Sequence, residues 1–258
     1  KDFAGNKLTS NDNGTVESNF EVYIPNKYLL AGDNGKIYSS TTGDANWTIV
    51  TTEYTDGIRD INCGKSVFVA TANGNDRLMT SSDNGTTWVS RTSNVASGLA
   101  AVHYGYQTFV AVGSSGVGTI SSDDNASTWT SINNPSTSTA DLWGVVSGNN
   151  VFVVVGQSGE IISSSDPDNA SSWTARSSGY TDKNFWDVAF GNNKFIAVGD
   201  SGKIIVSSDN GTSWNDVSSG VSVTLNAVHF NNGVFVAGGR TGTLITSSDN
   251  GTTWIPRT

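Results

Sequence analysis

The chain carries one eight-residue stretch in three near-identical copies, the first of which is Ser81-Ser82-Asp83-Asn84-Gly85-Thr86-Thr87-Trp88. The other two copies occupy residues 207–214 and 247–254. The Asp side chain in such a stretch can accept hydrogen bonds from the amides that follow it, and Asn-Gly supplies residues that tolerate positive φ. The stretch therefore predicts a hairpin turn, after which the Trp opens the next strand and packs its ring between neighbouring units.

Looser copies of this turn extend the repeat along the chain. Six tryptophans mark it at spacings of 40 to 44 residues: Trp47, Trp88, Trp129, Trp173, Trp214 and Trp254. The copy before Trp47 is the most altered, because Thr42 takes the place of the Asp and Asp44 that of the Gly. A period of this length, with four short apolar runs in each repeat, is typical of propeller blades.

The predicted fold class is all-β, a single β-propeller of six four-stranded blades closed into a ring. No segment shows the periodicity of an amphipathic helix. The predicted blades cover residues 20–53, 57–93, 98–133, 140–178, 184–219 and 224–258. Residues 1–19 align with the third and fourth strands of a repeat, so they form either an N-terminal hairpin or part of a seventh, incomplete blade.

The turn motif resembles the Asp-box (BNR) repeat of sialidase-like and photosystem II assembly-factor-like β-propellers. In those families Ser-x-Asp-x-Gly-x-x-Trp lies between the third and fourth strands of each blade. The resemblance covers residues 20–258 and implies a propeller fold. It leaves the function open, because the motif stabilises turns in enzymes, lectins and scaffolds alike.

The composition of the chain limits the classes of partner and the cellular locations that we expect. The net charge of −9 argues against binding to nucleic acid, which needs a basic surface. The sequence has no apolar run of transmembrane length and no signal peptide, so we expect no membrane insertion. It begins with Lys1, so we expect a mature product or a domain of a larger chain or assembly. Polar, Lys-poor, repetitive β sequence is common in extracellular, cell-surface and virion proteins, and we expect such a location here.

An enzymatic function would require particular catalytic residues in this sequence. The resemblance to sialidases would imply an arginine triad, but three of the six arginines stand three residues after a repeat Trp and belong to the outermost strand: Arg91, Arg176 and Arg257. A glycosidase needs two carboxyl groups, and three could supply them: Glu21, Asp60 and Asp187. Because carboxylates at strand starts are usually solvated turn residues, the sequence predicts no catalytic residues.

Metal and cysteine chemistry find little support in the sequence. His103 and His229 occupy the same repeat position, which favours a structural role, and further ligands are missing. The segment 166–169 resembles a turn more than a calcium loop. The single cysteine, Cys63, forms no intrachain disulfide and is expected to be a small buried hydrophobe. We therefore predict no metal site and no cofactor.

One column of the repeat, the second residue of each first strand, varies far more than the others. It contains Glu21, Arg59, Ala100, Trp143, Trp186 and Asn226. Trp143 and Trp186 are the two of the eight tryptophans that the turns do not explain. Aromatic faces among polar groups suit sugar recognition, whereas the alternative is that the two rings pack on each other and plug the channel. The candidate ligand-binding residues are Trp143, Trp186, Arg59, Glu21, Asp187 and Arg240.

The predicted function is a non-catalytic binding or scaffold propeller. It would serve adhesion or recognition at an extracellular or virion surface, such as a phage tail, and would contact a glycan or a protein partner through one face of the ring. Two alternatives stay open. One is a glycoside hydrolase of sialidase-like type, and the other is a structural propeller resembling the assembly factors.

Overall fold

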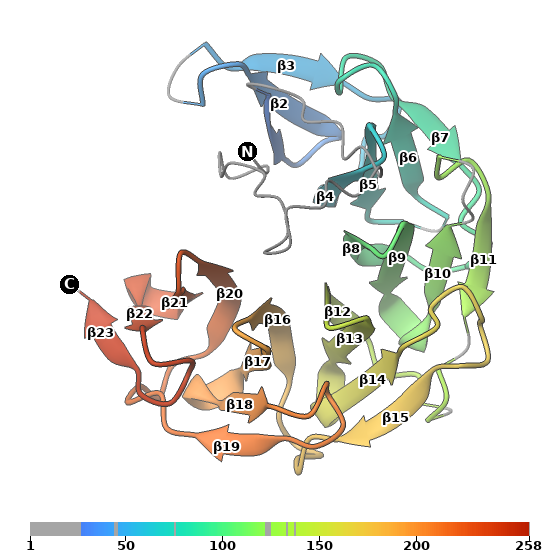
Figure 1. The fold of residues 1–258 in the computed structure, drawn as a ribbon. Helices are drawn as coiled ribbons and strands as arrows, with labels where there is room; N and C mark the ends of the chain where they lie inside the picture. The colour runs from blue at the N-terminus through green and yellow to red at the C-terminus, as the bar shows by residue number, and fades with distance from the viewer. Residues whose placement is uncertain are drawn as a thin grey trace, which may run out of the picture.

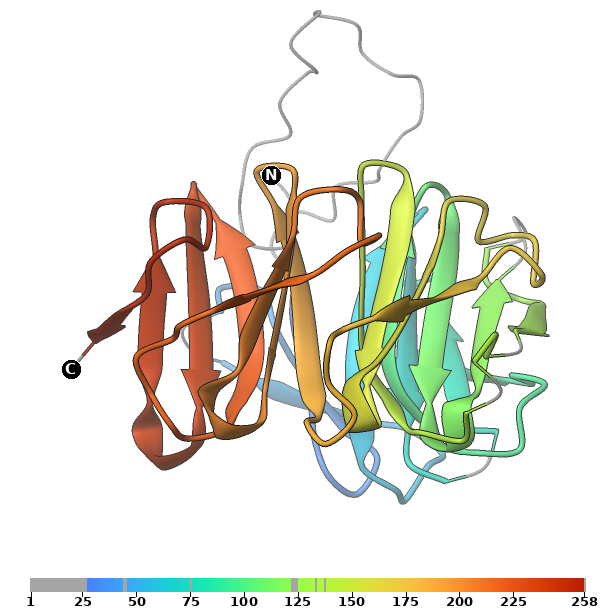
Figure 2. The ribbon, with the colours of Figure 1, turned by 90° about the horizontal axis from the view of Figure 1, so that it is seen from below.

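The computed structural model describes residues 27–43, 46–74, 76–121, 125–132, 134–136 and 138–257. They form one three-stranded and five four-stranded antiparallel sheets, in which sequential strands are neighbours. The three-stranded sheet contains β1 (Tyr28–Ala31), β2 (Lys36–Ser40) and β3 (Thr48–Thr51). Figure 1 shows the sheets around an arc whose ends are this sheet and the C-terminal blade, and Figure 2 shows the blades side by side.

The five blades repeat one order of strands from the centre of the arc outward. The first two blades consist of β4 (Ile58–Gly64), β5 (Val67–Ala72), β6 (Leu78–Ser81) and β7 (Val89–Arg91), and of β8 (Leu99–Gly105), β9 (Thr108–Gly113), β10 (Gly118–Ser121) and β11 (Trp129–Ile132). The third and fourth consist of β12 (Leu142–Gly148), β13 (Val151–Gly156), β14 (Glu160–Ser164) and β15 (Thr174–Ser177), and of β16 (Phe185–Gly191), β17 (Lys194–Gly199), β18 (Ile204–Ser207) and β19 (Asn215–Val217). The last consists of β20 (Leu225–Asn231), β21 (Val234–Gly239), β22 (Leu244–Ser247) and β23 (Ile255–Arg257).

The prediction of six four-stranded blades, and its alternative of seven, is wrong, because the described residues form five four-stranded blades. The first predicted blade, residues 20–53, corresponds to the three-stranded sheet, in which β1 pairs with β2 alone among the described residues. In its turn between β2 and β3, Thr42 stands at the position of the Asp, and the Ser40 hydroxyl accepts the amides of Thr42 and Gly43 at 3.2 and 3.1 Å. The strand expected from Phe20 and the hairpin or half-blade expected at 1–19 lie outside the described residues.

The predicted Asp turn, by contrast, forms as expected in the blades with intact copies. In the turn between β18 and β19, Asp209 Oδ1 accepts the Ser213 amide at 2.9 Å and Oδ2 accepts the Ser213 hydroxyl at 2.6 Å. The Ser207 hydroxyl also donates to this carboxylate, at 2.8 Å. These hydrogen bonds, the one from the Ser213 hydroxyl first, lower the pKa of Asp209 to about 2, although burial opposes the shift. The turn thus holds an ionised carboxylate.

The core lies between consecutive blades. Trp129, at the start of β11, shares a buried cluster with Val67, Val69 and Leu78 of the preceding blade. Trp254 shares another with Ile196 and Val206 of its preceding blade. The repeat tryptophans therefore hold blade against blade, as the sequence predicts. No helix in the described part of the chain is long and apolar enough to cross a membrane.

Glycines set the distance between the inner strands. Gly191 ends β16, and a Cβ placed on it would lie 2.1 Å from the ring of Phe230 in β20. Gly148 meets Phe190 in the same way, at 2.2 Å. Each of these inner strands thus ends in a notch that receives an aromatic ring of the next blade. Cys63, at the equivalent aromatic position of β4, is half-buried rather than fully buried.

Candidate functional site

The residue column that varies along the sequence coincides with a β-bulge in all five blades. The register between the first and second strands shifts at the second residue of each first strand. The five bulged residues are Arg59, Ala100, Trp143, Trp186 and Asn226. A bulge leaves its extra residue unpaired and redirects the side chain. These side chains therefore leave the alternation that packs one blade on the next, and the core does not constrain their identity.

A second set of residues lies beside the bulges. Fourteen residues after each bulged residue, the chain leaves the second strand through Asn73, Ser114, Gln157, Asp200 or Arg240. In the last four cases this residue opens a 3-10 turn: η1 (Ser114–Gly116), η2 (Gln157–Gly159), η3 (Asp200–Gly202) or η4 (Arg240–Gly242). Its amide donates to the carbonyl oxygen two residues before the bulge in every blade, at 2.8 to 3.0 Å. We call these ten residues the bulge face.

Trp143 and Trp186 stack on each other within the bulge face. Their ring centroids are 4.1 Å apart and the ring planes differ by 7°. The indole nitrogen of Trp186 donates to Asp200 Oδ1 at 2.9 Å, and Asp200 Oδ2 accepts the Asn184 amide at 3.2 Å. Both rings are half-buried. The two rings thus pack on each other, which was the alternative to sugar recognition. Contact of the pair with a ligand stays a prediction.

The predicted arginines also lie on the bulge face. Arg59 is exposed, and its Nε donates to Asn73 Oδ1 at 2.7 Å. The bulged residue and the turn residue of the first blade are thus hydrogen-bonded, as Trp186 and Asp200 are in the fourth blade. Arg240 opens η4 and is exposed. Glu21 lies outside the described residues. The structure thus brings four of the six predicted residues to one end of the blades.

Asp187 is the predicted residue that turns away from this face. Its Oδ1 accepts the Val188 amide and its Oδ2 accepts the Val228 amide of the next blade, both at 2.8 Å. Burial raises the pKa of Asp187 to about 7, and the charge of Asp60 adds to the increase. Asp187 therefore joins two inner strands through their backbone, and its role in ligand binding stays a prediction.

Asp60 makes the same link between the first and second blades. It accepts the amides of Ile61 at 2.8 Å and of Val102 in the next blade at 2.9 Å, and burial raises its pKa. The repeated geometry identifies both carboxyl groups as clamps between blades. Their oxygens cover amides on the inner edge of the next blade's first strand.

His103 of the second blade contacts the next blade, which gives it a structural role. His103 Nε2 lies 3.1 Å from the Ser147 hydroxyl of the next blade, and the His103 ring meets Phe152 edge-on. Burial lowers the pKa of His103 to about 4, so the ring is neutral near pH 7. Within the described ranges, no group of three or more His, Cys, Asp or Glu residues could hold a metal ion.

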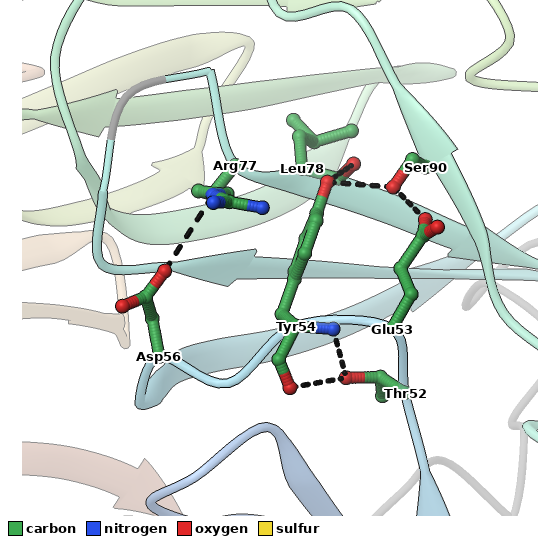
Figure 3. A network of polar contacts seen from close by, with 7 residues as sticks. All are labelled: Thr52, Glu53, Tyr54, Asp56, Arg77, Leu78 and Ser90. Carbon is green, nitrogen blue, oxygen red and sulfur yellow. Dashed lines mark hydrogen bonds and ion pairs between the residues drawn. The ribbon is translucent and has the colours of Figure 1, made fainter.

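An open cleft of about 320 Å³ lies at the rim, between the three-stranded sheet and the first blade. Figure 3 shows its polar network around Tyr54, whose hydroxyl donates to the Leu78 carbonyl at 3.1 Å and accepts the Ser90 hydroxyl at 2.8 Å. Arg77 lies 4.6 Å over the Tyr54 ring and pairs with Asp56 at 3.5 Å. Sequence reasoning did not identify this cleft.

The same cation-on-tyrosine arrangement recurs between the third and fourth blades. Lys203 lies 4.9 Å from the centre of the Tyr180 ring and pairs with Asp216 at 3.0 Å. Tyr54 and Tyr180 both lie in the linker that enters a blade. The contacts in the rim cleft thus belong to the repeat and fasten a linker to the next blade. The bulge face, where the repeats differ, is the better candidate for a functional site.

Radially arranged four-stranded antiparallel sheets define a β-propeller, and here its variable residues gather at one end of the inner strands. The predicted propeller class is thus confirmed. The chain belongs to the DUF6242 beta propeller domain family, whose sequence pattern matches residues 128–258, about half of the chain. No curated protein sequence matches the chain significantly.

Solved structures share the fold at low sequence identity. YCF48 bound to D1 peptide is 14% identical with a TM-score of 0.69, and the match covers 90% of this chain and 77% of that one. YCF48 from Cyanidioschyzon merolae has the same identity and TM-score, with 92% and 83% covered. AFV00434, an ancestral GH74 enzyme, is 13% identical with a TM-score of 0.69, and the match covers 92% of this chain but 38% of the enzyme. These similarities establish the fold alone.

Proposed function

We propose that this protein is a non-catalytic binding module that contacts a glycan or a protein partner through the bulge face. One observation carries the proposal: the blades share a frame of turns and core residues, yet the pair of bulge and turn residues differs in each blade. Surface side chains that the core does not constrain are where a repeat scaffold carries specificity. The bulge face includes the stacked tryptophans and five exposed polar residues: Arg59, Asn73, Gln157, Asn226 and Arg240.

The positions of Asp60 and Asp187 favour a binding function over hydrolysis. A retaining or inverting glycosidase needs two carboxyl groups that can reach a glycosidic bond. Asp60 and Asp187 instead use both oxygens on backbone amides. Protonating or attacking a substrate would require them to give up the contacts that join the blades. Similarity in fold to a GH74 enzyme does not bear on this chemistry.

Two kinds of partner fit the face. A glycan would use the indole rings for stacking and the amide and guanidinium groups for hydrogen bonds. A protein segment is the other candidate, and the likeness in fold to a YCF48 structure that holds a D1 peptide supports it.

The test is a binding screen of the folded protein against arrays of glycans and of peptides. Replacing either Trp143 or Trp186 by Ala should weaken binding by about 1 to 3 kcal/mol, roughly 5- to 150-fold, because a stacking surface is lost. Tyr106→Ala is the matched control, since Tyr106 is 43% exposed in the hairpin at the other end of the blades. Binding unaffected by both tryptophan variants would overturn the proposal, as would glycoside turnover lost in Asp187→Asn.

We also propose that the module works at an extracellular, cell or virion surface as part of a larger chain or assembly. The support is its polar, repetitive composition, with charged residues at 14%. Antibody labelling of intact and lysed source material would test this, and a signal found only after lysis would contradict it.

A further inference from the structure

The bulge face carries short side chains in its second blade, between longer side chains of the blades on either side. The bulged residue of the second blade is Ala100, and its neighbours in the column are Arg59 before it and Trp143 after it. Ala100 has the smallest side chain of the five bulged residues in the described part of the chain. The turn residue of the same blade is small too, Ser114. Ala100 and Ser114 therefore reach less far from the backbone than the side chains beside them, and we call the place of these two short side chains the depression.

Trp143 is the bulged residue of the blade that follows Ala100, and it supplies an aromatic ring surface. One face of its indole lies on Trp186, which a hydrogen bond to Asp200 holds in place, so the pair is fixed before any ligand arrives. The other face is turned away from Trp186 and its blade. The Trp143 indole N–H has no hydrogen-bond partner among the described residues. A prearranged ring of this kind loses little side-chain entropy when a ligand stacks on it.

The polar groups around the depression are mostly hydrogen-bond donors. Arg59 uses Nε on Asn73, and no acidic side chain of the described residues pairs with its guanidinium. Gln157 accepts the Asp141 amide with Oε1 at 3.2 Å, which leaves its NH₂ group for other partners. The Ser114 hydroxyl adds a group that can donate or accept. The rim thus combines one apolar plane with several directed donors.

We infer that the ligand of the proposed binding module is a saccharide, and that one pyranose ring lies over Ala100 against the outer face of Trp143. This inference rests on the proposed function and adds the ligand class and the subsite. A pyranose has an apolar C–H face for the indole and a rim of hydroxyls for Arg59, Ser114 and Gln157. An apolar peptide side chain in the same place would leave these donors without acceptors, which is unfavourable.

The test uses isothermal titration with four neutral hexasaccharides as probes: maltohexaose, cellohexaose, laminarihexaose and chitohexaose. We expect at least one to bind and to shift the tryptophan fluorescence. Ala100→Leu fills the depression and should weaken that binding at least tenfold with an unchanged melting temperature. Arg59→Gln should weaken it less, since one donor group remains. Val89→Ala, a change at a side chain that is 52% exposed on the outermost strand of the first blade, is the control and should leave binding unchanged.

The outcomes separate this inference from the proposed function. If none of the hexasaccharides binds, or if Ala100→Leu binds as well as the wild type, the saccharide subsite is overturned. Peptide binding that depends on Trp143 and Trp186, in the absence of saccharide binding, would overturn the inference and keep the proposed function. Binding of any ligand that ignores both tryptophans would overturn both.

Discussion

At the scale of single residues, the ionisation of Asp187 opposes the folded state. Burial raises the pKa of its carboxyl from 3.8 to about 7, so between these values the folded protein keeps a proton that the unfolded chain has released. The free energy of unfolding therefore falls as the pH rises through this window, by up to roughly 1.4 kcal/mol per pH unit. Asp60, the charged group that acts on Asp187, strengthens the effect.

Asp187→Asn should remove this pH dependence. The amide is neutral at every pH, and its oxygen can still accept one of the two backbone amides. Guanidinium unfolding in steps from pH 4.5 to pH 8 should show the variant gaining stability relative to the wild type as the pH rises. Asp182→Asn is the control, because it makes the same chemical change at a side chain that is 73% exposed. Parallel profiles for wild type and Asp187→Asn would contradict the assignment.

The sequence could not reveal this role of Asp187. The amide that it binds on the next blade belongs to Val228, 41 residues further along the chain. Ala101, Gly144 and Ala227 occupy the equivalent position in three other blades, so no pattern of the repeat marks it as a clamp. A contact between blades depends on how two inner strands face each other, and one strand's sequence does not specify that.

At the scale of elements, the Asp turn should contribute measurably to stability through its ionised form. Asp209→Ala should lower the free energy of unfolding by about 1 to 2 kcal/mol at pH 7, because the Ser213 amide and hydroxyl lose their acceptor. The pKa of Asp209 is lowered to about 2, so its contribution is complete above the ordinary pKa and is lost as the pH falls toward 2. Denaturation at pH 7 and at pH 2 should thus show a difference from wild type that shrinks in acid. Equal differences at the two values would argue against this role.

Turns and bulges differ in how far the sequence predicts them. The turns were predicted correctly because their donors and acceptors lie within four residues of one another, as with Asp209 and Ser213. The bulges were not predicted, although the sequence did single out their column. A bulge is a shift in register between two strands, as where Leu142 pairs with Gly156 but Gly144 with Val155. The alternation of residues along one strand does not show such a shift.

At the scale of the whole molecule, the last blade is more exposed than the blade before it. Ile196 and Ile204 of the fourth blade are fully buried, whereas Val236 and Leu244 at the equivalent positions of the last blade are 38% and 43% exposed. A blade is stabilised by its neighbours, so an end blade buries one face less. Counting turns in the sequence gave six blades because it registers a repeat even where, as before Trp47, Thr42 replaces the Asp and the described residues form only three strands.

The junctions between blades should depend on their glycine notches. Gly191→Ala would place a methyl group 2.1 Å from the Phe230 ring, and relieving this overlap should lower the free energy of unfolding by about 1 to 3 kcal/mol. Gly238→Ala is the matched control, since it is also a strand glycine and a Cβ there meets nothing within 4 Å. Adding Phe230→Ala to Gly191→Ala removes the overlap, so the double variant should lose less stability than the sum of the two single variants, by at least roughly 0.5 kcal/mol. Strictly additive losses, or equal damage from Gly238→Ala, would show that the blades do not close on this notch.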